Sequence, residues 1–469
     1  MAKRIDLTEG AIVKKLVKLA IPIMATSFIQ IAYNMADMIW IGRVGSNEVA
    51  AVGTAGFFAM IAASLAMVSK VGVEIKVSQS LGRHDDEAAK NYIVSAIQIN
   101  ILLSIIYSII VIIFKKEFIG FFKLGNEEVI KMAEVYLLAI GSAMSITCMI
   151  PVFTAIFNGA GNSRIPFVIN AVGLVINIVL DPILIMGIGP FPKLGVLGAA
   201  LATIAAQCVV VIYFISIILK SKEEYLKFNI FKRPNIRTIK TICKLGLPSG
   251  FQNGLFTLFT ILIARVIAVW GPVPIAVQKV GSQIEAISWM TAGGFSTALG
   301  AFVGQNYGAK KYDRIKKGYK ATIMMAIVVG GITSLLLIFG GEFIFSIFIP
   351  EKEAISYGKE YLKILGYSQL FMCIEITTAG AFNGIGRTYI PASISIILTG
   401  LRVPFAILLS STALLGLNGV WWSISISSIL KGVVVTSVFL IMLKKNKLIK
   451  DKNFQGTILP KETIELSSK

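Results

Sequence analysis

Two carboxylates, Asp37 and Asp181, lie inside sequence runs that are otherwise almost entirely apolar. Asp37 belongs to the stretch YNMADMIWIGRVG, and Asp181 belongs to NIVLDPILI. A carboxyl group in a low-dielectric pocket can hold a proton near neutral pH and release it when water gains access. With amide and hydroxyl oxygens beside it, the same group can bind a hard cation such as sodium. The alternative is that both acids only hold helices together by hydrogen bonds, but such a role rarely requires ionisable side chains.

The composition of the chain explains why water is scarce around these acids. Of the 469 residues, 55% are hydrophobic and 15% are charged, and the mean hydropathy is +0.79. An ordinary soluble domain carries about a quarter charged residues, so we expect an integral membrane protein. The net charge of +20 comes from basic residues between the apolar runs. This pattern suits a cytoplasmic membrane face, and no nucleic-acid partner is expected.

Other kinds of chemistry find little support in the sequence. His84 is the one histidine, and the four cysteines are far apart along the chain. Neither a metal site nor a histidine-based catalytic triad is therefore expected. The nucleotide-binding pattern G-x-x-x-x-G-K-[ST] does not occur. The sequence thus predicts a protein that is not an enzyme and has no organic cofactor, with H+ or Na+ as its small-ion ligand.

Twelve apolar segments are long enough to cross a bilayer, for which about 20 residues are needed. An even number of crossings puts both termini on one side, and most of the 45 lysines and arginines fall on that side. The positive-inside rule then predicts cytoplasmic termini and a multi-pass protein of the plasma (inner) membrane. The predicted spans are 17–41, 49–80, 91–114, 131–157, 165–189, 194–219, 245–270, 274–304, 318–347, 355–383, 389–413 and 418–443.

The two halves of the chain are repeats of one another. KLAIPIM at Lys18 resembles KLGLPSG at Lys244, and VSQSLG at Val77 resembles VGQNYG at Val303, both at an offset of 226 residues. IFNGAGNSRIP at Ile156 matches AFNGIGRTYIP at Ala381 at an offset of 225. Each half has six spans, so the axis relating them runs along the membrane normal. Two such lobes can open alternately to either side, which favours a transporter, expected to act as a monomer.

These patterns define a fold class and a division of the chain. We expect an all-α polytopic membrane protein with 12 transmembrane helices in two six-helix bundles. The bundles are related by a pseudo-two-fold axis. The divisions are an N-terminal lobe at 1–219, a basic cytoplasmic connector at 220–244, a C-terminal lobe at 245–443 and a polar cytoplasmic tail at 444–469.

Depth counting brings the two acids to one level of the membrane. Asp37 is about 20 residues into its span and Asp181 about 17, which at 1.5 Å per residue is about 30 Å and about 25 Å from the cytoplasmic start. Asn34 and Asn177 share a helical face with Asp37 and Asp181, respectively, and can hydrogen-bond them. Tyr136 and Thr203 reach the same level from the opposite side. Pro182 follows Asp181 and can free backbone carbonyls there.

Several motifs resemble those of the multidrug and toxic compound extrusion (MATE) family, specifically its prokaryotic branch with acids in spans 1 and 5. The likeness extends from the first to the last span. The motifs that carry it are LTEGAIVKKLVKLAIPIM, YNMADMIWIGRVG, AVGTAGF, IFNGAGNSRIP, NIVLDPILI and GQNYGAKKYDR.

The resemblance implies exchange of an inward proton or sodium ion for an outward-moving substrate, often a cationic amphiphile. In the acid-bearing branch, a Tyr of span 4, an Asn and Asp of span 5 and a Thr of span 6 form the cation network. Here those places are held by Tyr136, Asn177, Asp181 and Thr203. The expected partners are these small molecules and membrane lipid, with H+ favoured over Na+ as the coupling ion.

The C-terminal half departs from this pattern. In the repeat alignment Arg402 replaces Asn177 and Ile263 replaces Asp37. We expect Arg402 to pair with Glu285, with Glu375 as the competing partner; a substrate-facing role for either acid is the alternative. Another branch of the family has acids early in span 7 and in span 10, whereas span 7 here offers only Gln252 and Asn253.

Two further sets of residues are assigned from spacing and residue type. Lys70 and Glu74 are four apart in span 2 and are expected to form a structural ion pair or an inner gate latch. Met35 and Met290 are expected in an adaptable substrate cavity, because methionine repacks easily. Gln252, Asn253, Glu285 and Glu375 complete this candidate cavity.

Two other functions fit the sequence less well than cation-coupled multidrug efflux. A flippase for a lipid-linked precursor or another amphiphile belongs to the same superfamily, and the basic C-terminal half would suit a phosphate-bearing headgroup. A membrane-embedded transferase should show clustered polar catalytic residues at one face, and the sequence shows none.

Overall fold

The computed structural model describes residues 5–349, 351–411 and 414–445, and the regular structure of these residues is helical. Part of the predicted tail, residues 446–469, lies outside the described residues. The first half of the chain forms α1 (Ile12–Val44), α2 (Ser46–Gly82), α3 (Asp86–Ile113), α4 (Lys115–Gly120), α5 (Glu127–Ser142), α6 (Met144–Thr147), α7 (Met149–Gly159), α8 (Arg164–Met186) and α9 (Val196–Leu219). After the short helix η1 (Glu224–Leu226), the second half forms α10 (Ile236–Ala268), α11 (Pro272–Gly308), α12 (Tyr312–Ser346), α13 (Lys352–Gly384), α14 (Tyr389–Gly400), α15 (Arg402–Leu409) and α16 (Leu417–Lys444).

Each of the twelve predicted spans corresponds to one long helix or to one broken helix. In the described part of the chain, ten helical segments are long and apolar enough to cross a membrane, and a bent pair makes an eleventh. The twelfth is α13, which has 33 residues and packs against α11, α12 and α16. α10 begins nine residues before the predicted start of its span, so the connector is shorter than expected.

Two of the spans are broken, the fourth and the eleventh. The fourth span bends by 54° at Ala143, between Glu127–Ser142 and Met144–Gly159. Further along the same span, Pro151 cannot bond the carbonyl of Thr147, where α6 ends. Pro404 likewise cannot bond the carbonyl of Gly400, where α14 ends before α15 begins.

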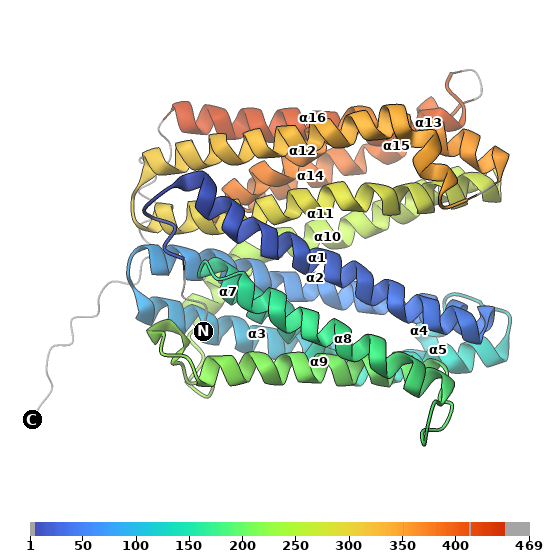
Figure 1. Ribbon diagram of the computed structural model, residues 1–469, viewed down its shortest axis with the longest axis horizontal. Helices are drawn as coiled ribbons and strands as arrows, with labels where there is room; N and C mark the ends of the chain where they lie inside the picture. The colour runs from blue at the N-terminus through green and yellow to red at the C-terminus, as the bar shows by residue number, and fades with distance from the viewer. Residues whose placement is uncertain (1–4, 350, 412–413, 446–469) are drawn as a thin grey trace, which may run out of the picture.

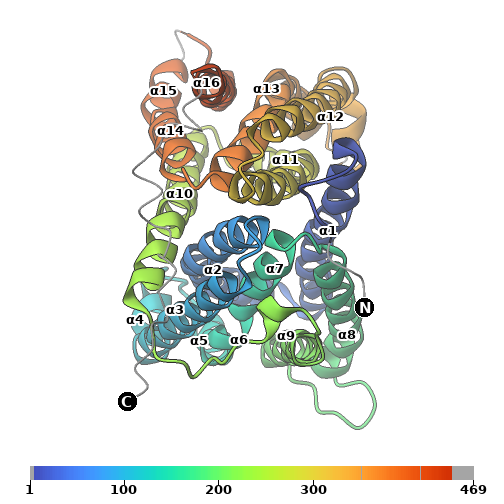
Figure 2. The same ribbon diagram turned by 90° about the vertical axis from the view of Figure 1, so that its left-hand side faces the viewer.

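The helices form two bundles, but α1 and α10 each belong partly to both (Figures 1 and 2). α1 packs on α11 and α12 of the second bundle as well as on α8 of the first. Leu16, Leu19 and Ile23 in its first half are buried in one cluster with Phe295 and Phe302 of α11. α10 mirrors this arrangement, because it packs on α2 and α3 as well as on α14 and α15. The sequence did not predict this exchange.

The bundles meet most closely on the side where α1 begins and α16 ends, called here the terminal side (left in Figure 1). There α2 and α11 approach backbone to backbone. A Cβ on Gly82 would lie 2.0 Å from the Gln305 carbonyl oxygen, and one on Gly308 would lie 2.1 Å from that of Gln79. Small residues permit such close helix contacts in membranes.

Two glutamines from the repeated motifs bond across this contact. Gln79 Nε2 donates to the carbonyl of Gly384 at 2.9 Å, and Gln305 Nε2 donates to that of Gly159 at 3.1 Å. Both acceptors belong to the repeated FNG motif. The two repeat motifs on the terminal side therefore join the bundles symmetrically.

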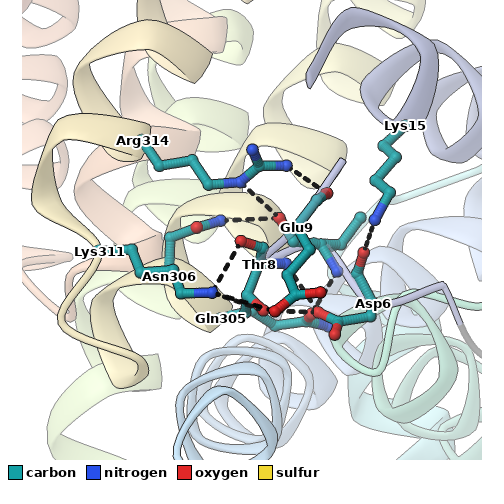
Figure 3. A network of polar contacts seen from close by, with 9 residues as sticks. Asp6, Thr8, Glu9, Lys15, Gln305, Asn306, Lys311 and Arg314 are labelled. Atoms are coloured by element: carbon teal, nitrogen blue, oxygen red, sulfur yellow. Dashed lines mark hydrogen bonds and ion pairs between the residues drawn. The ribbon is translucent and has the colours of Figure 1, made fainter. Parts of the chain in front are cut away.

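An N-terminal strap, residues 5–11, covers the same contact (Figure 3). The Ile5 amide donates to Gly161 of the first bundle at 3.3 Å, and the Leu7 amide donates to Gln305 Oε1 of the second at 3.1 Å. Further side chains of α11 and α12 bind strap carbonyls: Asn306 and Arg314 bind Leu7, Lys311 binds Thr8, and Arg314 also binds Glu9. Leu7 itself is buried. The strap thus ties both bundles together on the terminal side.

The contact between α2 and α11 leads to a prediction about stability. Gly308→Ala places a methyl group against the Gln79 backbone, so the helices must separate. We expect the free energy of unfolding to fall by about 1–3 kcal/mol, as for other overpacked sites. Thermal unfolding of the purified protein in detergent measures this loss. Gly293→Ala is the matched control, because no atom lies within 4 Å of a Cβ there. Equal melting temperatures for the two variants would contradict the close contact.

Candidate functional site: a buried pair of carboxyl groups

The site begins with the packing of α1 against α8. Tyr33 of α1 donates from its hydroxyl to the Gly173 carbonyl of α8 at 2.9 Å. Gly173 leaves room for α9, since a Cβ there would lie 2.4 Å from Val210, whereas its distance of 3.4 Å from the Tyr33 hydroxyl would be an ordinary contact. The Tyr33 hydrogen bond is one helical turn from Asp37, so it fixes the face of α1 that meets α8.

Asp37 and Asp181 meet directly at this packing contact. Their carboxyl groups lie within hydrogen-bonding range of each other. Thr203 of α9 donates to Asp37 Oδ2 at 3.2 Å, and Asn177 Nδ2 donates to Asp181 Oδ1 at 3.1 Å. Asp181 and Asn177 are fully buried and Asp37 is partly buried. Four of the sequence-predicted residues therefore form one connected cluster.

The fifth residue of the cluster is Tyr136 of α5. Its side chain is 7% exposed, and it interacts electrostatically with both Asp37 and Asp181. Pro182 follows Asp181 within α8, so the Ile178 carbonyl has no amide partner one turn earlier. The cluster thus draws side chains from α1, α5, α8 and α9 of the first bundle.

Three oxygens of this cluster are buried without a hydrogen-bond donor: Asp37 Oδ1, Asp181 Oδ2 and Asn177 Oδ1. Among the described residues, no lysine or arginine interacts with either carboxyl group. Two negative charges in contact at low dielectric cannot both be left uncompensated. The arrangement can therefore hold a proton between the carboxyls or a small cation among the three oxygens.

Asn34 does not join the cluster. Its side chain is exposed, and within the described residues it makes no hydrogen bond to Asp37. The three-residue spacing puts both side chains on neighbouring positions of α1. However, the packing of α1 on α8 turns Asp37 inward and leaves Asn34 outside. The prediction that Asn34 binds Asp37 is wrong in this structure.

Lys70 and Glu74 of α2 do not form the expected ion pair. No nitrogen–oxygen contact within 4.0 Å joins Lys70 and Glu74 in the described chain, although the lysine charge acts on the carboxylate through space. Glu74 instead lines a cavity of about 40 Å³ between the bundles, with Ser296 and Asn383 on the facing wall. Helical spacing places the two side chains on one face, but the bundle contact draws Glu74 away.

The second bundle carries a polar cluster of its own, with partners other than those predicted. Glu285 of α11 accepts from the Tyr361 hydroxyl at 2.7 Å and from Gln369 Nε2 at 3.1 Å, both on α13. Arg402 donates from Nε and Nη2 to the hydroxyls of Ser427 and Ser428 on α16 at 3.0 and 2.9 Å.

Glu375 pairs with Lys431 rather than with Arg402. The Nζ–Oε2 distance is 3.2 Å, and both side chains are almost fully buried. Arg402 interacts electrostatically with Glu375 and Glu285 but makes no ion pair within 4.0 Å to either in the described residues. The predicted direct Arg402–Glu285 pair is therefore wrong, because the serines of α16 hold the guanidinium instead.

The residues proposed for a substrate cavity do not gather in one place. Asn253 of α10 donates to Ser64 of α2 at 2.9 Å, near the middle of the contact between the bundles. Met35 of α1 is 57% exposed, and Gln252 and Met290 are partly buried. Glu285 and Glu375 belong to the polar cluster inside the second bundle. Side-chain type alone did not distinguish these environments.

Sequence reasoning missed Tyr33, Tyr361, Gln369, Ser427 and Ser428. One signal for Tyr361 was available, because it stands 225 residues after Tyr136, the offset of the FNG motifs. For the others, the partner depends on contacts between helices that no spacing encodes. In the described part of the chain, no three His, Cys, Asp or Glu side chains group so that they could hold a metal ion.

Comparison with known proteins identifies the family of the chain. The family model MatE matches residues 22–183 and 248–408. The chain is 26% identical over 413 residues to the probable multidrug resistance protein NorM of Thermotoga maritima, covering 87% of this chain and 88% of that protein. It is 23% identical over 436 residues to a FAD transporter of Shewanella oneidensis, covering 92% and 95%.

A solved structure shares the fold. An outward-facing conformation of a multidrug resistance MATE family transporter of the MOP superfamily superposes with a TM-score of 0.86 at 24% identity, covering 95% of this chain and 99% of that one. The prediction of twelve transmembrane helices in two bundles is confirmed by this match.

The family model covers more than half of the chain and matches it once in each half. Members of this family are transporters and not enzymes, as the relatives' names indicate. The chain therefore belongs to the multidrug and toxic compound extrusion family of multi-pass membrane transporters.

Proposed function

We propose that this transporter is a proton-coupled antiporter that exports amphiphilic, often cationic, compounds. The observation that carries the proposal is the contact between Asp37 and Asp181, two buried carboxyls with donor-free oxygens and no described cation beside them. Such a pair must gain a proton or cation to be stable when buried, and must lose it when the pair is hydrated. Those two states are what an ion-coupled exchanger requires.

A proton suits the pair better than sodium. Two carboxyls in direct contact can share one proton through a hydrogen bond, as acid pairs in other proteins do. Among the described residues, sodium would find the donor-free oxygens of Asp37, Asp181 and Asn177 and the Thr203 hydroxyl as side-chain ligands. Hard cations prefer larger sets of oxygen ligands, so sodium would need water or backbone carbonyls, such as that of Ile178.

The path of α1 links the acid pair to the other bundle. Its second half carries Asp37 against α8, and its first half is packed in the core of the second bundle. We infer that a change in charge at Asp37 alters the α1–α8 contact, and that α1 transmits this change to the second bundle. α1 also contains Pro22, a position where the helix can bend.

The closed side of this conformation supports substrate release on the opposite side of the membrane. The terminal side is sealed by Gln79, Gln305 and the strap, whereas the cross-bundle hydrogen bonds of the described residues extend no further than Asn253 to Ser64. With both termini cytoplasmic, as the distribution of basic residues favours, this state is closed to the cytoplasm. Substrate would then leave on the opposite side of the plasma membrane.

A flippase for phosphate-bearing lipids is the alternative, and the second bundle argues against it. Lys431 is paired with Glu375, and Arg402 is bound by two serines and faces two carboxylates. These basic groups are therefore already compensated and are not free to bind a phosphate. The exposed methionines, such as Met35 and Met38, suit varied apolar substrates instead. We further propose that the protein acts as a monomer in contact with membrane lipid.

Asp37→Asn tests the coupling role. The amide keeps the shape of the side chain but can neither bind nor release a proton, so we expect efflux to fall to the level of cells without the transporter. Efflux of a fluorescent cationic amphiphile is measured at matched amounts of protein in the membrane. Asp313→Asn is the matched control, because Asp313 is exposed at the start of α12. Normal efflux by Asp37→Asn would contradict the coupling role.

Imposed ion gradients identify the coupling ion. In everted vesicles, substrate uptake should follow an imposed proton gradient in the absence of sodium. It should stop when that gradient is dissipated, because the carboxyl pair exchanges protons. Uptake that continues without a proton gradient but requires sodium would show instead that the oxygens of Asp37, Asp181 and Asn177 hold sodium.

A further inference from the structure

The polar cluster of the second bundle stands at the repeat position of the carboxyl pair. Tyr361 corresponds to Tyr136 and Arg402 corresponds to Asn177, both at the offset of 225 residues found for the FNG motifs. Tyr361 binds a carboxylate, Glu285, and Tyr136 interacts with Asp37 and Asp181. The two bundles thus each place a tyrosine near buried acid at the same depth.

The acid of the second cluster comes from a different helix. The repeat positions of Asp37 and Asp181 hold Ile263 and Ala406, so neither original carboxylate is kept. Glu285 of α11 supplies the negative charge instead, and Gln369 adds a second donor to it. The second bundle therefore has a partly buried carboxylate that comes from a helix other than those that carry Asp37 and Asp181.

The two clusters differ in charge balance, because the second contains cations and the first does not among the described residues. The first has two carboxyls and no interacting cation among the described residues. The second has two carboxylates, Glu285 and Glu375, and two cations, Arg402 and Lys431. Lys431 pairs with Glu375 at 3.2 Å, and Arg402 interacts electrostatically with both Glu375 and Glu285. Among the described residues, Arg402 is the cation that acts on Glu285.

The guanidinium is held in place by the surrounding helices. Ser427 and Ser428 accept from Arg402 at 3.0 and 2.9 Å, and the Ser427 hydroxyl is oriented by donating to the Leu398 carbonyl at 2.8 Å. Arginine keeps its charge at any physiological pH. A cation tethered in this way cannot be exchanged with solution.

We propose that the second cluster is a latent cation site in which the Arg402 guanidinium takes the place of an exchangeable ion. This inference rests on the proposed coupling role of Asp37 and Asp181. It assigns ion exchange to the first bundle alone and makes Arg402 the residue that keeps Glu285 from binding a proton or sodium. Replacing Arg402 with asparagine, the residue at the repeat position in the first bundle, should open a second site at Glu285.

Within the described chain, three groups act on Glu285: Tyr361 and Gln369 of α13 donate hydrogen bonds to it, and Arg402 at the start of α15 acts through its charge. Glu375 of α13 and Lys431 of α16 interact with Arg402. In the described residues, no charged side chain of α10 or α12 interacts with Glu285. Loss of the Arg402 charge therefore leaves Glu285 without its counter-charge, while Glu375 keeps Lys431 as its partner.

Proton uptake by the purified full-length protein tests this inference. Between alkaline and neutral pH, Arg402→Asn should take up about one more proton per protein than the parent, or bind about one radioactive sodium ion. Arg402→Asn/Glu285→Gln should return to the parental count, and Arg402→Lys, which keeps the charge, should match the parent. A parental count for Arg402→Asn would overturn the inference. So would a Glu285→Gln variant that lowers the parental count by one.

If Arg402→Asn folds poorly, the pH dependence of its melting temperature tests the same inference. An uncompensated Glu285 carboxylate destabilises the folded state at alkaline pH and is relieved as the pH falls and the group is protonated. The melting temperature of Arg402→Asn should therefore approach the parental value at low pH and be restored by Glu285→Gln. A loss that is independent of pH and unaffected by Glu285→Gln would refute the inference.

The same measurement separates this inference from the proposed function. Asp37→Asn in the parent should lower the proton count, because the exchangeable site lies in the first bundle. If Asp37→Asn leaves the count unchanged, the coupling role fails. The comparison of Arg402→Asn with its double variant still reports on Glu285 in that case.

Discussion

The contact between the carboxyl groups of Asp37 and Asp181 places an electrostatic cost inside the first bundle. An isolated carboxylate is costly inside a membrane, on the order of 3 kcal/mol on insertion scales. Here two lie together, and among the described residues Thr203 and Asn177 donate hydrogen bonds to them. Because the described chain supplies no positive charge beside them, we propose that an exchangeable ion provides the balance. Under this proposal, the packing of α1 on α8 is sensitive to the state of one proton.

That sensitivity matters because α1 is shared between the bundles. Its first half lies in the apolar core of the second bundle, so movement at Asp37 cannot stay within the first. On the terminal side, Gln79, Gln305 and the strap hold the bundles together through hydrogen bonds to backbone carbonyls. Each hydrogen bond of this kind contributes only a small net stabilisation. A closure built from such bonds can therefore open and form again.

The sequence predicted some levels of this structure well and others poorly. The long apolar runs gave all twelve spans, because length and hydropathy determine whether a helix can cross a bilayer. Depth counting brought Asp37, Asp181, Tyr136 and Thr203 to one level. Prediction failed where it needed the partner of a side chain across helices. Asn34 faces outward, Lys70 and Glu74 stay apart, and Arg402 binds serines rather than Glu285. Spacing along one helix defines a face but not what packs on it. For the same reason, the exchange of α1 and α10 between bundles was not predicted.

Infrared difference spectroscopy of the purified protein tests whether the carboxyl pair holds a proton. Proton binding by the pair predicts a carbonyl band of a protonated carboxylic acid at neutral pH that disappears when an exported substrate binds. This band should also be absent from Asp37→Asn/Asp181→Asn. A parent protein that shows no such band at neutral pH, or a band that the double substitution leaves unchanged, would contradict proton binding by the pair.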